Sequence, residues 1–417
     1  MTDKDQLPSL AGQPWLARSG TQAVFAALAA AGFAARAVGG VVRNALLGLP
    51  VTDVDIATPA RPEAVIAASR VAGLATIPTG LAHGTVTILS GGQPYEVTTL
   101  RTDVTTDGRR AKVAFTDDWA TDAGRRDFTM NALYCDAGGY VHDPLGGYPD
   151  VARRRVRFIG DPDQRIAEDY LRILRFFRFH AALGSGDIDR AGRDACVRGR
   201  AGLAQLSAER IRAELVRLLL GPRVLDAVAA MGDCGLLPAI LRVAPRPGVL
   251  SALVAAEAAL GASPDPMLRL SALSLAVEED QVALAHRLKL SNAERQALLV
   301  IDPLLGRQMA DLDAASARRR LYRLGIDHWR RAVVGSAAAS GRVDALTQGR
   351  KLLDLAANWP IPRLPVKGAD LLALGLAPGP EIGRILAEVE SWWVALDFPA
   401  ELRVRDRIAA IAEQRKG

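Results

Sequence analysis

Two aspartates stand one residue apart near the start of the chain, and their spacing suits a divalent metal ion. Residues 51–57 alternate between apolar and polar side chains, which is the pattern of a half-buried strand. On such a strand Val54 and Ile56 face the core, so Asp53 and Asp55 share the opposite face. Magnesium is usually held by one or two carboxylates together with substrate phosphates. We therefore expect Asp53 and Asp55 to bind Mg2+ as the catalytic pair of a reaction in which a hydroxyl attacks an α-phosphorus and pyrophosphate leaves.

A glycine turn and an arginine precede this pair and suit a nucleoside triphosphate. Residues 34–38 are expected to form a short strand and residues 41–47 a helix. Gly39 and Gly40 form the turn between them, where the backbone can approach a ligand closely. Free amides at the helix start, and the planar guanidinium of Arg43 in its first turn, suit phosphate oxygens. Either motif alone is common in ordinary turns and loops, so it is their order and spacing that favour a nucleotide site.

A strip of charged side chains is expected on a helix over residues 165–180. The strip has one acid and three guanidiniums spaced three residues apart, so that consecutive members are neighbours on the helix surface: Asp169, Arg172, Arg175 and Arg178. An Asp accepts from the exocyclic amine of cytosine or adenine, and an Arg donates to the ring nitrogen. One such pair accepts C and A and rejects G and U. The alternative for the arginines is a solvated or RNA-phosphate face. The phenylalanines of this helix are expected to be core residues: Phe176, Phe177 and Phe179.

Five ordered blocks of sequence together resemble a known family. They read Gly-Gly-Val-Val-Arg-Asn, Asp-Val-Asp, Arg-Arg-Asp-Phe-Thr-Met-Asn-Ala, Asp-Pro-Leu-Gly-Gly and Glu-Asp-Tyr-Leu-Arg-Ile-Leu-Arg, at residues 39–44, 53–55, 125–132, 143–147 and 168–175. The blocks resemble those of class II bacterial tRNA nucleotidyltransferases, the CCA-adding enzymes, and of their poly(A) polymerase relatives. The resemblance is close over the front half of the chain and loose over the remainder.

The resemblance implies an enzyme that adds C, C and A to the 3′ end of tRNA from CTP and ATP, with release of pyrophosphate. A poly(A) polymerase, or a CC-adding or A-adding member of the same family, is the alternative. Asp169 and Arg172 match the family's base-reading pair. The motifs and the resemblance together assign nucleotide binding to Gly39, Gly40, Arg43, Arg126, Asp169, Arg172, Arg175 and Arg178.

Three features are left open. Asn44 stands where the family's first block usually ends in Asp; an amide can substitute if that side chain only ties the loop together, and cannot if its charge tunes the metal site. Glu96, in a β-rich run at residues 95–100, is a candidate third acid, and a surface-facing Glu on an edge strand explains it equally well. The polar stretch at residues 101–125 is expected to be a mobile loop. In the family such a loop serves addition of the terminal A, and its full length here favours complete CCA addition.

The secondary-structure pattern predicts an α+β protein. Helical stretches alternate with β-rich runs up to about residue 150, and after residue 162 the β signal disappears. The resemblance implies a polymerase-β-like nucleotidyltransferase head, a mixed sheet with helices, followed by an all-helical neck, body and tail. We expect the catalytic head at residues 1–150, a base-selecting and RNA-binding neck at 151–220, and a tRNA-binding body and tail at 221–417.

Length and composition restrict the number of domains, the kind of partner and the location that we expect. At 417 residues the chain is too long for one ordinary core, and its net charge of +6 suits the acceptor and elbow backbone of tRNA. A genome base bias towards arginine explains that charge nearly as well.

The three cysteines are widely separated, so neither a disulfide framework nor a zinc site is expected. No signal region opens the sequence, and the apolar stretch at residues 21–35 is short for a membrane span. We expect a cytoplasmic protein without membrane contact; its oligomeric state is not predicted.

Two other classes of protein compete with this interpretation. An NAD-binding fold is disfavoured because Gly-x-Gly-x-x-Gly is absent, and no phosphate loop with Gly-Lys-Ser or Gly-Lys-Thr occurs. A catalytically silent RNA-binding protein stays open, because Asn44 departs from the family pattern.

Overall fold

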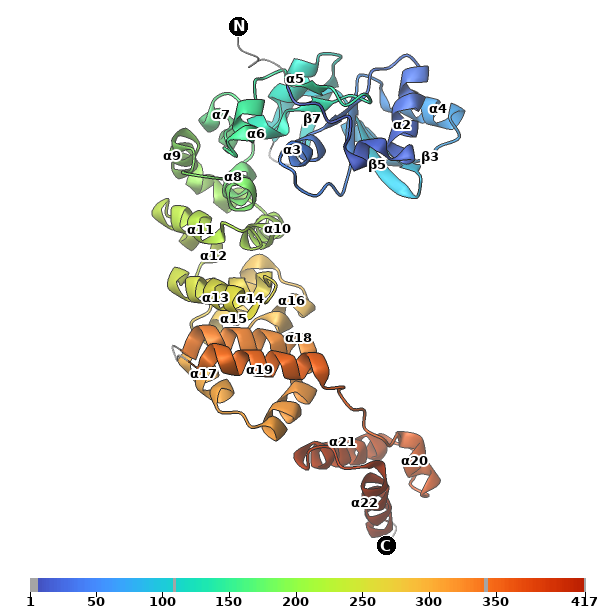
Figure 1. Ribbon diagram of the computed structural model, residues 1–417, viewed down its shortest axis with the longest axis vertical. Helices are drawn as coiled ribbons and strands as arrows, with labels where there is room; N and C mark the ends of the chain where they lie inside the picture. Colours follow the sequence, from blue (N-terminus) through green and yellow to red (C-terminus); the bar gives the residue numbers. More distant parts are fainter. Residues whose placement is uncertain (1–6, 108–109, 341–343, 416–417) are drawn as a thin grey trace. The chain divides into compact units, whose positions relative to one another are not determined.

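A seven-stranded sheet forms the centre of the N-terminal part of the chain (Figure 1). The structure, a computed structural model, describes residues 7–107, 110–340 and 344–415, and of residues 103–112 no side chain is described. The chain divides into two units, residues 1–242 with 287–289 and residues 243–286 with 290–417. The expected boundaries at residues 150 and 220 stay a prediction.

The sheet is mixed, as the sequence predicts. Its order is β3-β4-β5-β2-β1-β8-β9. The bounds are β1 Arg36–Val38, β2 Asp55–Thr58, β3 Ala75–Gly80, β4 Thr85–Ser90, β5 Gln93–Thr99, β8 Tyr134–Cys135 and β9 Val141–His142. Strands β2 and β5 pair in parallel, and each of the other neighbouring pairs is antiparallel. Helices α2 (Ser19–Ala30) and α4 (Pro62–Val71) pack against each other and against β4. The parallel pair β2 and β5 is the part of the sheet that carries the acids.

The alternation expected over residues 51–57 is present, although the strand itself is shorter. Val54 and Ile56 are buried, whereas Asp53 and Asp55 are exposed. Strand β2 begins only at Asp55. The two carboxylates therefore lie at the start of a central strand whose apolar side chains are fixed in the core.

The stretch expected to be a mobile loop contains regular structure, so that prediction is wrong. A two-stranded sheet pairs β6 (Arg101–Asp107) with β7 (Arg110–Phe115), and helix α5 (Trp119–Gly124) follows. Threonine and valine are frequent in this stretch, and β-branched residues favour extended backbone. The polar composition that suggested a loop is that of a two-stranded ribbon outside the main sheet.

Short elements complete the first unit around the sheet. They are α1 Pro14–Ala17, α3 Gly40–Leu46, η1 Leu81–His83, η2 Thr129–Asn131, α6 Tyr148–Ala152, α7 Pro162–Glu168, α8 Leu171–Leu183, α9 Arg190–Gly199, η3 Arg200–Gln205, α10 Ala208–Leu219, α11 Val224–Asp233 and α12 Leu236–Leu241. The phenylalanines expected to be core are buried: Phe176, Phe177 and Phe179. Helix α8 packs on α10 and α11, which fixes its charged face.

The single helix expected over residues 165–180 is broken, so that prediction is also wrong. Helix α7 ends at Glu168, and Asp169 follows in extended backbone with φ −156° and ψ 105°. The Asp169 carboxylate accepts a hydrogen bond from the backbone N–H of Leu171 at 3.1 Å, at the start of α8. Aspartate side chains compete in this way with the helical hydrogen bonds of the backbone. As a result Asp169 precedes α8, while Arg172, Arg175 and Arg178 lie on it.

All the regular elements that the structure describes in the second unit are helices. Its helices are α13 Pro247–Leu260, α14 Pro266–Ser274, α15 Glu278–Leu288, α16 Asn292–Ala297, α17 Pro303–Ala310, α18 Ala314–Ser340, α19 Ala345–Asn358, α20 Gly368–Ala373, α21 Pro380–Ala395 and α22 Glu401–Gln414. One apolar cluster forms around Trp329 and another around Trp393. None of the helices in the described ranges combines the length and the hydropathy that a membrane crossing requires.

Candidate active site

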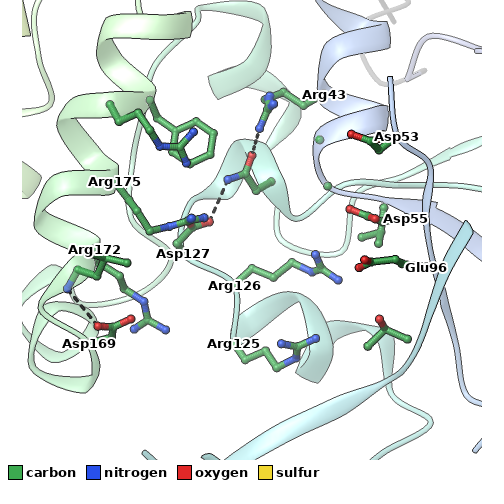
Figure 2. A pocket seen from close by; sticks show the side chains of 18 of the residues that line it. Arg43, Asp53, Asp55, Glu96, Arg125, Arg126, Asp127, Asp169, Arg172 and Arg175 are labelled. Carbon is green, nitrogen blue, oxygen red and sulfur yellow. Dashed lines mark hydrogen bonds and ion pairs between the residues drawn. The ribbon is translucent and has the colours of Figure 1, made fainter. Parts of the chain in front are cut away.

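One cavity of about 900 Å3 in the first unit collects every residue to which the sequence assigns chemistry (Figure 2). Its walls come from the turn between β1 and α3, from β2 and β5, from the segment before η2, and from α8 and α10. The predicted residues that line it are Gly39, Gly40, Arg43, Asp53, Asp55, Arg126, Asp169, Arg172, Arg175 and Arg178, and Glu96 lines it as well. Residues from blocks more than a hundred positions apart in the sequence thus share one space.

Three carboxylates line the strand side of this cavity. Asp55 on β2 and Glu96 on β5 are register partners in the parallel pair, and Asp53 lies two residues before β2 proper. Figure 2 shows Asp55 and Glu96 next to each other. Partial desolvation raises the pKa of Asp55, and the like charge of Glu96 adds to the shift. The Glu96 side chain is exposed, but its strand is not an edge strand, since β5 lies between β4 and β2.

The acids fit a hard cation that completes its shell with substrate oxygens. No three of the described His, Cys, Asp and Glu side chains come together as a ready metal cage. Magnesium does not need one, because it is commonly held by one or two carboxylates and by phosphates. Asp53 and Asp55 supply two carboxylates in the same cavity.

Arg43 enters the cavity from α3, after the predicted glycine turn. Gly39 has φ 74°, a left-handed conformation that favours glycine, and α3 starts at the next residue. The Arg43 side chain is only 9% exposed, and its Nη1 donates to Asn131 Oδ1 at 2.5 Å. Burial, together with Arg178 and Arg175 nearby, lowers the pKa of Arg43 to about 10. Arg43 therefore keeps its positive charge at neutral pH.

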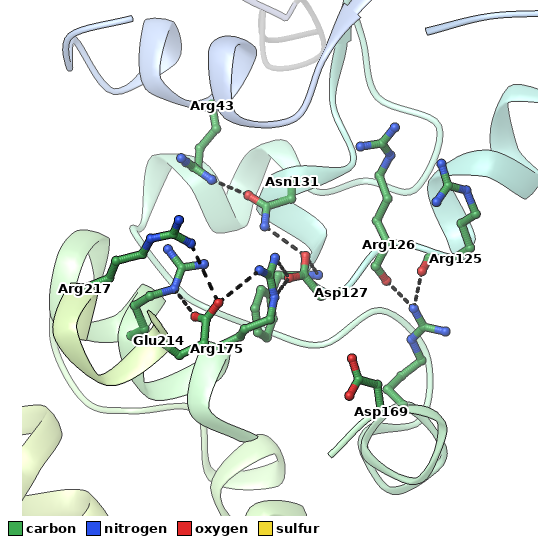
Figure 3. Close-up of polar contacts among 12 residues, drawn as sticks. Arg43, Arg125, Arg126, Asp127, Asn131, Asp169, Arg175, Glu214 and Arg217 are labelled. Atoms are coloured by element: carbon green, nitrogen blue, oxygen red, sulfur yellow. Dashed lines mark hydrogen bonds and ion pairs between the residues drawn. The ribbon is translucent and has the colours of Figure 1, made fainter. Parts of the chain in front are cut away.

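A chain of polar contacts leads from Arg43 to the helices of the opposite wall (Figure 3). Asn131 Nδ2 donates to Asp127 Oδ1 at 2.9 Å, and Arg175 Nε donates to Asp127 Oδ2 at 2.8 Å. Arg175 also lies 3.7 Å from Glu214 on α10. Burial favours the neutral form of Asp127, but Arg175 and the hydrogen bond from Asn131 outweigh it and hold the pKa below the ordinary value.

Comparison with known proteins identifies the family to which this cavity belongs. Residues 35–157 match the model of the poly A polymerase head domain, and residues 187–246 match that of the probable RNA and SrmB-binding site of polymerase A. The mouse mitochondrial CCA tRNA nucleotidyltransferase 1 is 36% identical over 364 residues, which cover 86% of this chain and 82% of the relative. The chain belongs to the class II CCA-adding enzyme and poly(A) polymerase family.

Two further relatives agree with this membership. The CCA-adding enzyme of Lactobacillus delbrueckii is 34% identical over 396 residues, covering 92% of this chain and 93% of the relative. The crystal structure of the Bacillus stearothermophilus CCA-adding enzyme in complex with CTP matches with a TM-score of 0.74 and 30% identity, covering 95% of this chain and 98% of that one. The expectations of a CCA tRNA nucleotidyltransferase and of its fold are confirmed, and the enzyme is a metal-dependent nucleotidyltransferase.

Arg126 of this family member is aimed into the cavity by a residue that sequence reasoning missed. Asp122 on α5 is 1% exposed and accepts hydrogen bonds from Arg126 Nη2 at 3.0 Å and from the Tyr134 hydroxyl at 2.8 Å. Arg125 also pairs with Asp122. Burial works against its charge, but the two arginines outweigh burial and lower the pKa of Asp122. The spacing of Asp122 to Arg125 and Arg126, three and four residues, was the available signal.

Asp169 and Arg172 line the cavity of the enzyme but do not pair with each other. Asp169 Oδ2 lies 2.7 Å from Arg210 Nη2 on α10. Arg172 Nη1 lies 2.5 Å from Glu168 and donates to the backbone carbonyl of Arg165 at 2.7 Å. The two side chains that the sequence assigns to base reading therefore each have a charged partner within the protein.

Glu214 is the second residue that sequence reasoning missed. This carboxylate of α10 is 4% exposed and lies 2.5 Å from Arg178 Nε. Arg175 and Arg217 approach it at 3.7 and 3.9 Å. The Arg178 guanidinium also stacks on Phe179 at 4.0 Å from the ring centroid. One buried acid therefore pairs with three arginines of the cavity and holds Arg178 most closely.

Proposed function

We propose that Asp53 and Asp55 hold Mg2+ against the triphosphate of the incoming nucleotide, and that C, C and A are joined to tRNA in this cavity. The support is the convergence of the two carboxylates with Arg43 and Arg126 in one space. When bound, the ion supplies positive charge that balances the triphosphate and the departing pyrophosphate. Glu96, in register with Asp55, is proposed as a third acid of the site.

The arginines of the cavity bind and orient the triphosphate. Arg43 and Arg126 offer planar guanidiniums to phosphate oxygens from opposite elements, α3 and the segment after α5. Both are anchored by protein partners, Arg43 by Asn131 and Arg126 by Asp122. Anchored donors lose little freedom when the nucleotide arrives, which favours binding in one orientation.

Selection of C and A falls to Asp169 and Arg172 on the helical side. An Asp and an Arg together match the exocyclic amine and ring nitrogen that cytosine and adenine share. Asp169 pairs with Arg210, and Arg172 pairs with Glu168. Base reading therefore requires each side chain to exchange its protein partner or share it with the base. Arg175 and Arg178, held by Asp127 and Glu214, are proposed to contact the nucleotide beside them.

The tRNA partner is proposed to lie against helical surfaces beyond the catalytic head. Double-helical RNA is recognised mostly by shape and by phosphate and ribose contacts, for which arginine is well suited. The structure neighbours with TM-scores of 0.61 to 0.65 and identities near 18%, one of them a Thermotoga maritima CCA-adding enzyme complexed with tRNA, share the fold. The proposed location is the cytoplasm. The mouse relative is mitochondrial, and cell fractionation tests which of the two locations this enzyme has.

The reaction is tested with purified enzyme and a tRNA transcript that lacks its terminal CCA. With CTP and ATP together we expect products that end in CCA; with CTP alone, products that end in CC. Product sequencing distinguishes complete from partial addition. Long tails made from ATP while CTP is ignored would replace CCA addition by polyadenylation as the proposal.

A further inference from the structure

Asn44 sits between the arginine of the cavity and the chain that leads to the catalytic aspartates. Its amide oxygen accepts two hydrogen bonds from the Arg43 guanidinium, from Nε at 3.1 Å and from Nη2 at 2.8 Å. Its amide nitrogen donates to the backbone carbonyl of Pro50 at 3.1 Å. Asp53 follows Pro50 by three residues. One side chain therefore uses both ends of its amide, and each end points to a part of the proposed site.

The contacts of Arg43 leave part of its guanidinium for a ligand. An arginine carries five N–H donors. Asn44 and Asn131 engage the Nε, Nη2 and Nη1 groups with one hydrogen bond each, and the face of the guanidinium lies 5.2 Å from the Phe179 ring. The guanidinium is held on three sides, yet two of its N–H donors have no partner among the described residues.

Arg43 differs from other arginines of the cavity in the charge of the groups that hold its guanidinium. Within the described ranges Arg43 makes no ion pair, whereas Arg126, Arg172 and Arg175 each pair with a carboxylate. Both groups that hold Arg43, the amides of Asn44 and Asn131, are neutral. An amide fixes the position of a guanidinium as a carboxylate does, but it does not cancel the charge.

We propose that Asn44 is a positioning residue that holds Arg43 by a neutral amide, so that the full charge of Arg43 is kept for the triphosphate. The amide nitrogen of Asn44 fixes the Pro50 carbonyl at the same time. Aspartate, the usual residue of the family at this position, would keep the acceptor for Arg43, but it would hold Arg43 by an ion pair and would lose the donor to the Pro50 carbonyl. It would cancel the charge of Arg43, and it would place a carboxylate oxygen against a carbonyl oxygen. The inference rests on the proposed place of the triphosphate beside Arg43.

Equilibrium binding of CTP in the absence of tRNA tests this role without relying on turnover. We expect Asn44→Ala to raise the Kd for CTP about tenfold, the effect of losing hydrogen bonds to a charged group. We expect Asn44→Asp to raise it about fivefold through charge cancellation, with a weaker dependence of Kd on salt than in the parent. Asn358→Ala, which removes an amide-to-carbonyl hydrogen bond on α19, is the matched control and leaves Kd unchanged.

A double-mutant cycle separates this role from a general structural one. If Asn44 acts through Arg43, then Asn44→Ala adds no further change in Kd to an enzyme that already carries Arg43→Ala. Additive effects, or a Kd within twofold of the parent for either Asn44 variant, overturn the proposal. An unchanged Kd for Arg43→Ala alone has another meaning: the triphosphate does not lie beside Arg43, and the proposed site itself fails. Melting temperatures confirm that each variant is folded.

Discussion

The two walls of the cavity carry opposite charges, and they differ in whether the charged side chains have ion-pair partners among the described residues. On the strand wall Asp53, Asp55 and Glu96 lie together, and none of them makes an ion pair with a described residue. On the helical wall Arg172 and Arg175 each pair with a protein carboxylate. Like charges placed side by side without ion-pair partners raise the free energy of the folded protein, and at Asp55 the charge of Arg126 offsets only part of this effect. The strand wall therefore depends on a ligand cation, whereas the helical wall is balanced before any ligand arrives.

This difference separates two tasks. The uncompensated carboxylates give a strong preference for a divalent ion, because binding removes their mutual repulsion. The compensated arginines lose some attraction for phosphate but gain fixed positions, which base selection requires. Arg43 stands between the two cases, since it is held by neutral amides and keeps its charge.

The largest effect is expected on the strand wall. Asp53→Ala or Asp55→Ala removes one of two carboxylates for the metal, and we expect nucleotide incorporation to fall at least about a thousandfold, which corresponds to ~4 kcal/mol of activation free energy. The measurement is single-turnover transfer of CMP from CTP to a tRNA that lacks CCA, with release of pyrophosphate. Unchanged turnover in both variants would remove these residues from the site. Asp117→Ala, an exposed acid of the same unit, is the control.

A smaller but global effect is expected when the balance of the helical wall is broken. Glu214→Gln leaves Arg178 without its buried counter-ion, and we expect the free energy of unfolding to fall by about 3 kcal/mol. Denaturant unfolding measures the change. Glu209→Gln on the same helix breaks an exposed pair with Lys289 and should barely alter the unfolding midpoint. Equal destabilisation by both variants would contradict the idea that this wall is held by buried charge compensation.

Base selection is expected to change more modestly. Arg172→Ala removes the proposed donor to the ring nitrogen, and we expect discrimination between CTP and UTP to fall about tenfold, since a well-placed pair of base contacts is worth ~1–3 kcal/mol. The quantity to compare is kcat/KM for the two nucleotides. Arg198→Ala, which breaks an exposed pair with Asp163, controls for loss of an arginine near α7. An equal fall for CTP and UTP would assign Arg172 to phosphate binding instead.

The strand wall was predictable from local sequence, and much of the helical wall was not. Apolar alternation places Val54 and Ile56 in the core, so the face of the two aspartates follows from a period of two. The pairing of Asp127 with Arg175 joins residues 48 positions apart, and no local rule predicts it.

The prediction of one helix over residues 165–180 failed for a related reason. The helical spacing of the charged residues continues through Asp169, but that side chain accepts a hydrogen bond from the backbone N–H of Leu171 at the start of α8 and pairs with Arg210. The expected loop at residues 101–125 failed because polar composition does not distinguish a solvated loop from a two-stranded ribbon. In both cases hydrogen bonds that composition and spacing do not reveal decide between local alternatives: strand pairing for the ribbon, and the contacts of the side chain for Asp169.

The smallest effect expected concerns stability in buffer without divalent ions. The raised pKa of Asp55 in the folded state means that the folded protein binds more protons than the unfolded chain just above the ordinary aspartate pKa. The free energy of unfolding therefore decreases as pH rises from about 4 through the pKa of folded Asp55, and stays lower above it.

Asp55→Asn should remove this decrease, so that the variant melts at a higher temperature than the parent at neutral pH in the absence of Mg2+. Adding Mg2+ should raise the melting temperature of the parent and leave the variant nearly unchanged, because only the parent keeps both carboxylates. Asp117→Asn is the control and should follow the parent in both conditions. A parent whose melting temperature ignores Mg2+, or a variant that is less stable without it, would show that the acids of the strand wall are not held in mutual repulsion and that the two walls are equally balanced.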